Sequence, residues 1–189
     1  MKIQQYTRYL LALCILFGAL SGIPAAADQT SPRLDELFTR LQLTRDQQQL
    51  RFIENAIWEL WMQHENSDVE QLLVLGTRRM NAGQFPAALL IFNELTASYP
   101  DFAEAWNKRA TLYYLLGEFD SSLADIEQVL ELEPRHFGAL SGAGLIHLQR
   151  ENLNQAREAF EQLLEVHPAS PNGQANLELV LERLRRNLI

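Results

Sequence analysis

Residues 67–100 read SDVEQLLVLGTRRMNAGQFPAALLIFNELTASYP, and two further stretches of the same length follow them without a gap. Residues 101–134 read DFAEAWNKRATLYYLLGEFDSSLADIEQVLELEP, and residues 135–168 read RHFGALSGAGLIHLQRENLNQAREAFEQLLEVHP. Each stretch ends in a proline, which cannot continue a helix, and Pro100, Pro134 and Pro168 are 34 residues apart. A period of this length predicts a tandem array of helical repeats.

Each stretch contains two apolar helical segments with a break between them. The second segments are predicted at residues 85–98, 119–132 and 154–166, and the breaks at residues 81–83, 116–117 and 150–152. Ser67 with Glu70, and Asp101 with Glu104, are spaced as capping boxes or close relatives of them, so they mark helix starts.

The repeat resembles the tetratricopeptide repeat family over residues 67–168. The first unit carries Leu72, Leu75, Gly76, Ala88, Phe92 and Pro100 at the signature positions of that family. The second unit carries Trp106, Tyr113, Gly117, Phe119 and Pro134, and the third carries Leu140, Gly144, Ala156, Phe160 and Pro168. Arg109, Ser122, His147 and Glu151 depart from the family pattern. The resemblance implies an all-α fold, a right-handed superhelical stack of antiparallel helix pairs with three repeats and helical caps.

Packing considerations agree with this fold. Gly76 and Gly144 occur where paired helices must come close, and the small residues Ala88 and Ala156 occur on the facing segments. Arg109 falls at a position where an apolar residue normally packs between helices. Because a buried arginine needs a carboxylate partner, we expect an ion pair with Asp125 or Glu127, or else an arginine that grips a ligand.

Both ends of the array carry further helical segments. Ser170 and Pro171 mark the start of a capping helix at residues 171–187, within a C-terminal segment 169–189. Residues 28–66 contain a helix at 34–41 and a longer one, capped by Thr44, that reaches Met62. The longer helix has too many apolar residues for one stripe, so we expect it to be covered on two sides. This pair can be interpreted as a degenerate fourth repeat.

Residues 1–27 have the pattern of a secretory signal peptide. Lys2 and Arg8 precede an apolar run at 10–23, and small residues at 25–27 predict cleavage before Asp28. An uncleaved membrane anchor is the alternative, although the run is shorter than the roughly 20 residues that span a bilayer. Cys14, the only cysteine, lies within this segment, so the mature chain has no thiol. These features predict an exported protein of the bacterial periplasm without stable membrane insertion after cleavage.

Charge and motif content argue against several functional classes. The formal net charge is −8, and loss of Lys2 and Arg8 with the signal peptide lowers it to −10, which disfavours nucleic acid as a partner. No catalytic constellation, cofactor motif or metal motif stands out. His147 and Glu151 are four residues apart but have no third ligand nearby in sequence. We therefore expect a non-catalytic protein without cofactor or metal.

Function is then expected on the inner face of the superhelix, which the first helix of each repeat lines in this family. The helical period places eleven candidate partner-binding residues there: Leu73, Thr77 and Met80 from the first repeat, Asn107, Lys108, Thr111 and Tyr114 from the second, and Gly138, Ser141, Gly142 and Leu145 from the third. The basic residues needed to grip a C-terminal carboxylate are missing from the third repeat.

Gly138, Ser141 and Gly142 form a patch of small residues. Glycine inside a helix costs roughly 0.5 to 1 kcal/mol relative to alanine, so this patch calls for an explanation. Either a partner helix or peptide lies on it, or the N-terminal helices of the chain, with Trp58 and Trp61, fold back over it.

These observations favour a protein–protein interaction adaptor of the cell envelope, which binds an unidentified peptide or helix in its concave groove. The alternative is a self-associating envelope component that pairs through apolar surface near Trp58, Trp61 or the C-terminal cap. An enzyme would need a polar pocket with titratable groups, and the sequence gives no sign of one.

Overall fold

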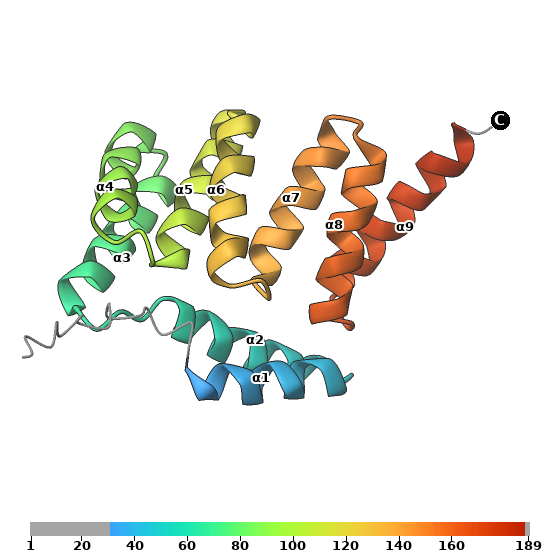
Figure 1. Cartoon of the computed structure of the whole chain (residues 1–189), viewed down its shortest axis with the longest axis horizontal. Coiled ribbons are helices and arrows are strands. Elements are labelled where there is room, and N and C mark those ends of the chain that lie inside the picture. Colours follow the sequence, from blue (N-terminus) through green and yellow to red (C-terminus); the bar gives the residue numbers. More distant parts are fainter. Residues whose placement is uncertain (1–30, 188–189) are drawn as a thin grey trace, which may run out of the picture.

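The computed structural model describes residues 31–187, which form nine helices and no strand. Figure 1 shows α3 to α9 side by side as a curved array, with α1 and α2 lying across its lower edge. The helices are α1 (Pro32–Leu43), α2 (Gln47–Trp61), α3 (Ser67–Asn81), α4 (Phe85–Ser98), α5 (Ala103–Leu116), α6 (Phe119–Leu132), α7 (Phe137–Gln149), α8 (Leu153–Val166) and α9 (Pro171–Arg186). The predicted stack of antiparallel helix pairs is confirmed: α3 pairs with α4, α5 with α6 and α7 with α8, and α9 caps the last pair.

The breaks within the three repeats rest on residues with left-handed backbone conformation. Gly83 and Gly117 have φ values of 70° and 77°, where glycine has no side chain to strain. In the third repeat the same conformation is held by Glu151, with φ of 57°, at the position where the sequence departs from the expected glycine. Its carboxylate is paired with Arg183 of α9 at 2.7 Å.

The helix starts differ from the expected ones by one or two residues. Asn66, not Ser67, caps α3, and its side chain accepts a hydrogen bond from the Asp68 N–H. Asp46, not Thr44, caps α2 through the Gln49 N–H. The Ser170 cap with Pro171 in the first turn of α9 is as predicted. The predicted caps were displaced because several short polar residues compete for each helix start.

Glycine–phenylalanine contacts set the spacing of helices within two of the repeats. A Cβ atom built on Gly76 would lie 2.5 Å from the Phe92 ring of α4, and one on Gly144 would lie 2.5 Å from the Phe160 ring of α8. Both phenylalanines are fully buried. The missing methyl groups therefore allow each ring to lie directly against the backbone of the paired helix.

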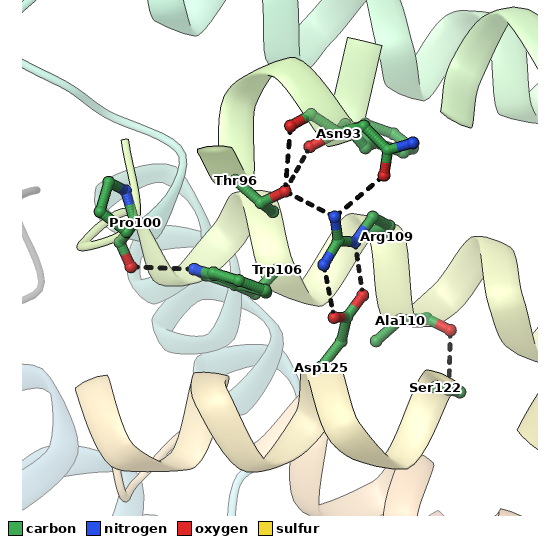
Figure 2. Close-up of polar contacts among 9 residues, drawn as sticks. Asn93, Thr96, Pro100, Trp106, Arg109, Ala110, Ser122 and Asp125 are labelled. Carbon is green, nitrogen blue, oxygen red and sulfur yellow. Dashed lines mark hydrogen bonds and ion pairs between the residues drawn. The ribbon is translucent and has the colours of Figure 1, made fainter. Parts of the chain in front are cut away.

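Arg109 forms the ion pair that the sequence predicted, and its partner is Asp125 rather than Glu127. Its Nε and Nη2 donate to the two Asp125 oxygens, both at 2.8 Å, so that α5 is joined to α6 (Figure 2). Nη1 donates to Asn93 Oδ1 and Thr96 Oγ1 of α4. One guanidinium thus connects three helices of two successive repeats, and the hydrogen bonds to Asp125 raise its pKa.

The helices α1 and α2, here called the N-terminal hairpin, lie across the turns that join successive repeats. Their buried face packs with Phe137, Val166 and Ala169, which come from the α6–α7 and α8–α9 ends of the array. The pair does not stack in line with α3 as a fourth repeat would; it runs crosswise beneath the repeats (Figure 1). The expectation that α2 is covered on two sides is met by α1 on one side and by these turns on the other.

Two tryptophans fix the hairpin to the array. The Trp61 ring stacks on the His136 ring with centroids 4.0 Å apart and an interplanar angle of 12°. Trp58 meets His136 and Phe137 edge-on at 5.4 Å. Further along α2, Glu54 Oε1 lies 3.1 Å from the His167 Nε2 atom of the α8–α9 turn. Burial raises the pKa of the Glu54 carboxyl, although Arg51 opposes this effect.

Within residues 31–187, no helix is both long and apolar enough to cross a membrane. The predicted signal peptide, residues 1–27, lies outside the described residues.

The glycine contacts yield a first prediction. Gly144→Ala should lower the free energy of unfolding by about 1–3 kcal/mol, because the new methyl group overlaps the buried Phe160 ring. Gly142→Ala, two residues away on the same helix, meets only a terminal methyl of Ile126 at 3.3 Å and should gain up to about 1 kcal/mol of helix propensity. Urea unfolding of both variants checks this, and equal effects would contradict the assigned role of Gly144.

A second prediction concerns Arg109. Arg109→Met should cost about 3 kcal/mol because it leaves the buried Asp125 carboxylate without its cation. The double variant Arg109→Met/Asp125→Leu should recover at least half of this loss, as measured by urea unfolding. Arg150→Met, which removes an ion pair to the exposed Asp120, is the matched control and should cost less than about 1 kcal/mol. Equal costs for the two single variants would refute the structural role of Arg109.

A third prediction concerns pH. Burial lowers the pKa of the His167 imidazole, so the folded chain binds this proton less readily than the unfolded chain. As the pH falls below the ordinary histidine value of about 6.5, unfolding takes up a proton and the free energy of unfolding decreases. Between about pH 7.5 and pH 5.5 the wild type should lose more stability than His167→Asn, by up to about 1.4 kcal/mol per pH unit. Identical pH slopes in urea titrations would contradict the burial of this imidazole beneath α2.

Candidate functional site

A pocket of about 190 Å³ opens between α5 and α7, and we refer to it as the α5–α7 pocket. Its lining comes from three helices: Asn107, Ala110, Thr111 and Tyr114 of α5, Ser122 and Ile126 of α6, and Gly138, Ala139, Ser141, Gly142, Leu145 and Ile146 of α7. None of these side chains carries a formal charge.

Small side chains create the pocket. Ala110 on α5 and Gly142 on α7 leave space through which Ile126 of α6 reaches the lining. A Cβ atom on Gly142 would have only the Ile126 Cδ1 atom nearby, at 3.3 Å. Gly142 thus has one close neighbour, the end of a flexible side chain, whereas Gly144 contacts a buried ring. The third repeat therefore uses one glycine for packing and exposes another to the pocket.

The polar groups of the pocket are largely satisfied within the protein. Ser122 Oγ donates to the Ala110 carbonyl at 2.8 Å, and Thr111 Oγ1 donates to the Asn107 carbonyl at 2.9 Å. The Asn107 side-chain amide donates to Glu104 Oε2 at 2.9 Å. These bonds hold the side chains in place and give the pocket a mainly apolar surface with a few fixed oxygen atoms.

Lys108 stands beside the pocket, but its charge is compensated within the chain. Its ammonium lies 2.7 Å from Glu104 Oε1 and 5.3 Å from the centre of the Trp58 ring. Glu104 is fully buried and also contacts His136 Nε2 at 3.1 Å. Burial by itself would raise the pKa of the Glu104 carboxyl, but Lys108 and His136 outweigh it and hold the pKa below its usual value. The carboxylate therefore stays ionised and neutralises the lysine.

His136 is fixed in one tautomer by its neighbours. The Ala139 N–H donates to Nδ1 at 3.1 Å, so Nδ1 carries no proton and Nε2–H donates to Glu104. The ring thereby caps α7 and bridges to α5 while Trp61 stacks on its face.

Seven of the eleven candidate residues lie together in the pocket: Asn107, Thr111, Tyr114, Gly138, Ser141, Gly142 and Leu145. Gly138 lies at the end that the N-terminal hairpin reaches, where its Cβ position would be 2.7 Å from the Trp58 ring. The patch of small residues was expected to contact either a partner or the N-terminal helices, and the structure divides it between these two possibilities. Trp58 of the chain covers Gly138, and Gly142 remains open.

The other four candidates are placed differently. Leu73 and Met80 are buried in the core between α3, α4 and α5, so they do not line a groove. Thr77 is half-buried, and its hydroxyl donates to the Leu73 carbonyl. Lys108 is held by Glu104 as described. Helical periodicity misplaced Leu73 and Met80 because α3 is an end helix, whose buried face is rotated towards α4 and α5.

Sequence reasoning missed five lining residues, Ala110, Ser122, Ile126, Ala139 and Ile146. The sequence did contain one signal for the residues of α6. Ala110 of α5 and Gly142 of α7 are both small, so side chains of α6 can reach the pocket between these two helices. Sequence analysis also did not single out His136, whose ring is fully buried. The surface near Trp58 and Trp61, considered for self-association, is occupied by contacts within the chain.

The described part of the chain has no group of three His, Cys, Asp or Glu that could bind a metal ion.

Comparison with known proteins agrees with the fold. The profile of the tetratricopeptide repeat family matches residues 73–124, 108–173 and 142–185. A TPR repeat-containing protein of Rhizobium etli is 36% identical over 162 residues, which cover 86% of this chain and 79% of the relative.

Two solved structures share the fold at low sequence identity. The first TPR of Spaghetti (RPAP3), bound to the HSP90 peptide SRMEEVD, aligns with a TM-score of 0.61 at 19% identity over 64% of this chain and 96% of its own. The Yersinia enterocolitica type III secretion chaperone SycD, in complex with a peptide of the translocator YopD, has a TM-score of 0.59 at 15% identity and covers 63% of this chain and 96% of its own. On the family profile and the Rhizobium relative, this chain belongs to the tetratricopeptide repeat family.

Proposed function

We propose that this protein is a non-catalytic adaptor of the bacterial cell envelope that binds an uncharged, apolar segment of a partner protein in the α5–α7 pocket. The observation that carries the proposal is the pocket itself, which Gly142 lines with its backbone and whose lining has no charged side chain. Glycine within a helix lowers stability by about 1 kcal/mol relative to alanine. A partner that approaches the backbone of α7 closely at Gly142 would explain why glycine occurs there.

The chemistry of the pocket favours an apolar partner segment over an acidic one. The HSP90 peptide SRMEEVD, bound by the similar domain of Spaghetti, has three acidic residues. In this chain Lys108, a cation beside the pocket, is neutralised by Glu104 and covered by Trp58. Apolar side chains can instead reach Ile126, Leu145 and Ile146, and the fixed polar groups of Asn107 and Thr111 can orient a peptide backbone.

Location in the envelope is part of the proposal and rests on the sequence of residues 1–27. The charged start, the apolar run and the small residues before Asp28 support export to the periplasm.

A fourth prediction tests binding in the pocket. A photoreactive amino acid at Thr111 should crosslink a partner protein in intact cells, whereas one at the exposed Glu161 of α8 should not. Gly142→Leu should abolish the Thr111 crosslink, because its side chain occupies the pocket, and its Cβ atom has only the Ile126 Cδ1 atom as a close neighbour.

Gln155→Leu adds the same side chain on the exposed face of α8 and serves as the control. It should leave the Thr111 crosslink unchanged, and the thermal unfolding of both variants should match that of the wild type. Crosslinks that persist in a folded Gly142→Leu protein, or that form equally from Glu161, would refute binding in the pocket.

A further inference from the structure

The outer face of α3 ends the array, and no helix within residues 31–187 caps it. A shallow open hollow on this helix is lined by Asp68, Glu70, Gln71, Leu72, Val74, Leu75 and Arg78. In the interior of the array every first helix has a preceding helix pair against this side, and the last pair is covered by α9. Leu75 has 40% of its surface exposed. Terminal repeats of solenoids normally need a polar capping surface, and two leucines do not provide one.

The position of the N-terminal hairpin explains why this face is bare. These helices precede the first repeat in sequence and could have stacked on α3. They are instead held beneath the α6–α7 and α8–α9 turns by the Trp61–His136 stack and the buried leucines and isoleucines of α1 and α2. The chain therefore has no other described helix that covers the outer side of α3.

Two opposite charges flank the half-buried Leu72 and the exposed Leu75. Asp68 lies in the first turn of α3 and Arg78 in the last. They are ten residues apart, about 15 Å along the helix, so they cannot pair with each other. The neighbouring charges are engaged elsewhere, since Glu70 accepts a hydrogen bond from the His64 N–H and Arg79 donates to Gln84. Among the described residues no ion pair is formed by Asp68 or Arg78.

We propose that a second copy of this chain covers the outer face of α3, with the two α3 helices antiparallel about a two-fold axis near residue 73. Positions 68 and 78, and likewise 71 and 75, are symmetric about that residue. An antiparallel neighbour therefore places Asp68 of each copy opposite Arg78 of the other, with the leucines of both copies between the two ion pairs.

This self-complementary arrangement distinguishes a second copy from other occupants. An isologous interface requires that the same patch be its own partner, and α3 meets the requirement because Asp68 and Arg78 lie at equal distances from its centre. The arrangement leaves the α5–α7 pocket free in each copy, because none of its lining residues belongs to α3. A dimer then carries two pockets, which strengthens binding to a partner that presents two segments.

Sedimentation equilibrium tests the proposal. The protein is expressed from the full-length sequence in bacteria and purified as the cells process it. The wild type should show a concentration-dependent equilibrium between one and two copies. Asp68→Arg alone, or Arg78→Asp alone, should weaken dimerisation by at least about tenfold, because each replaces two attractive pairs with two repulsive ones. The double variant Asp68→Arg/Arg78→Asp restores opposite charges across the axis and should return dimerisation to within about threefold of the wild type.

Leu75→Lys should also shift the protein to a single copy, whereas Leu90→Lys, on an exposed position of α4, should not. Circular dichroism of every variant establishes that it is folded. A wild type that remains a single copy at all concentrations would overturn the proposal. So would a double variant that stays as weak as the folded single variants, because no symmetric pairing of α3 could then exist.

Discussion

The stacking of Trp61 on His136, with Trp58 lying over Gly138, fixes where the N-terminal hairpin lies, and most other features of the molecule depend on this contact. It holds α2 across the turns between repeats rather than in line with them. Trp58 there covers Lys108, which Glu104 already neutralises, and so the adjacent pocket is uncharged. The same placement leaves the outer face of α3 without a covering helix. One aromatic contact thus determines both the character of the pocket and the open end of the array.

The repeat architecture was predictable from sequence because local and long-range signals agree. The prolines every 34 residues and the breaks at residues 81–83 and 116–117 fixed the helices almost to the residue. The Arg109–Asp125 pair was predictable because an arginine at an apolar position requires a carboxylate on the facing helix. In this case the partner lies one helix away, and the helical period limited the choice to Asp125 or Glu127 without deciding between them.

The destination of the N-terminal hairpin was not predictable in the same way. The apolar residues of α2 show that it is buried, but they fit several surfaces about equally well, because hydrophobic burial is not directional. Its docking site is built from residues at the helix ends and turns of the array, His136, Val166 and Ala169, and the helical period of α2 does not point to them. The same limitation explains the pocket: the seven predicted residues lie on α5 and α7, whereas Ser122 and Ile126 reach it from α6 through gaps that only the packed structure defines.

The placement of the hairpin is tested most directly by short-range crosslinking between cysteine pairs in a Cys14→Ser background, which removes the only natural thiol. Gln42 of α1 donates to the Glu165 carbonyl of α8, so Gln42→Cys/Glu165→Cys should be joined rapidly by a short bismaleimide. Asn55→Cys/Gln71→Cys, which would be neighbours if α2 stacked on α3, should remain unlinked under the same conditions. Efficient linkage of the second pair with none of the first would contradict this placement of the hairpin, because Trp58 could then not cover Gly138 and the outer face of α3 would not be open.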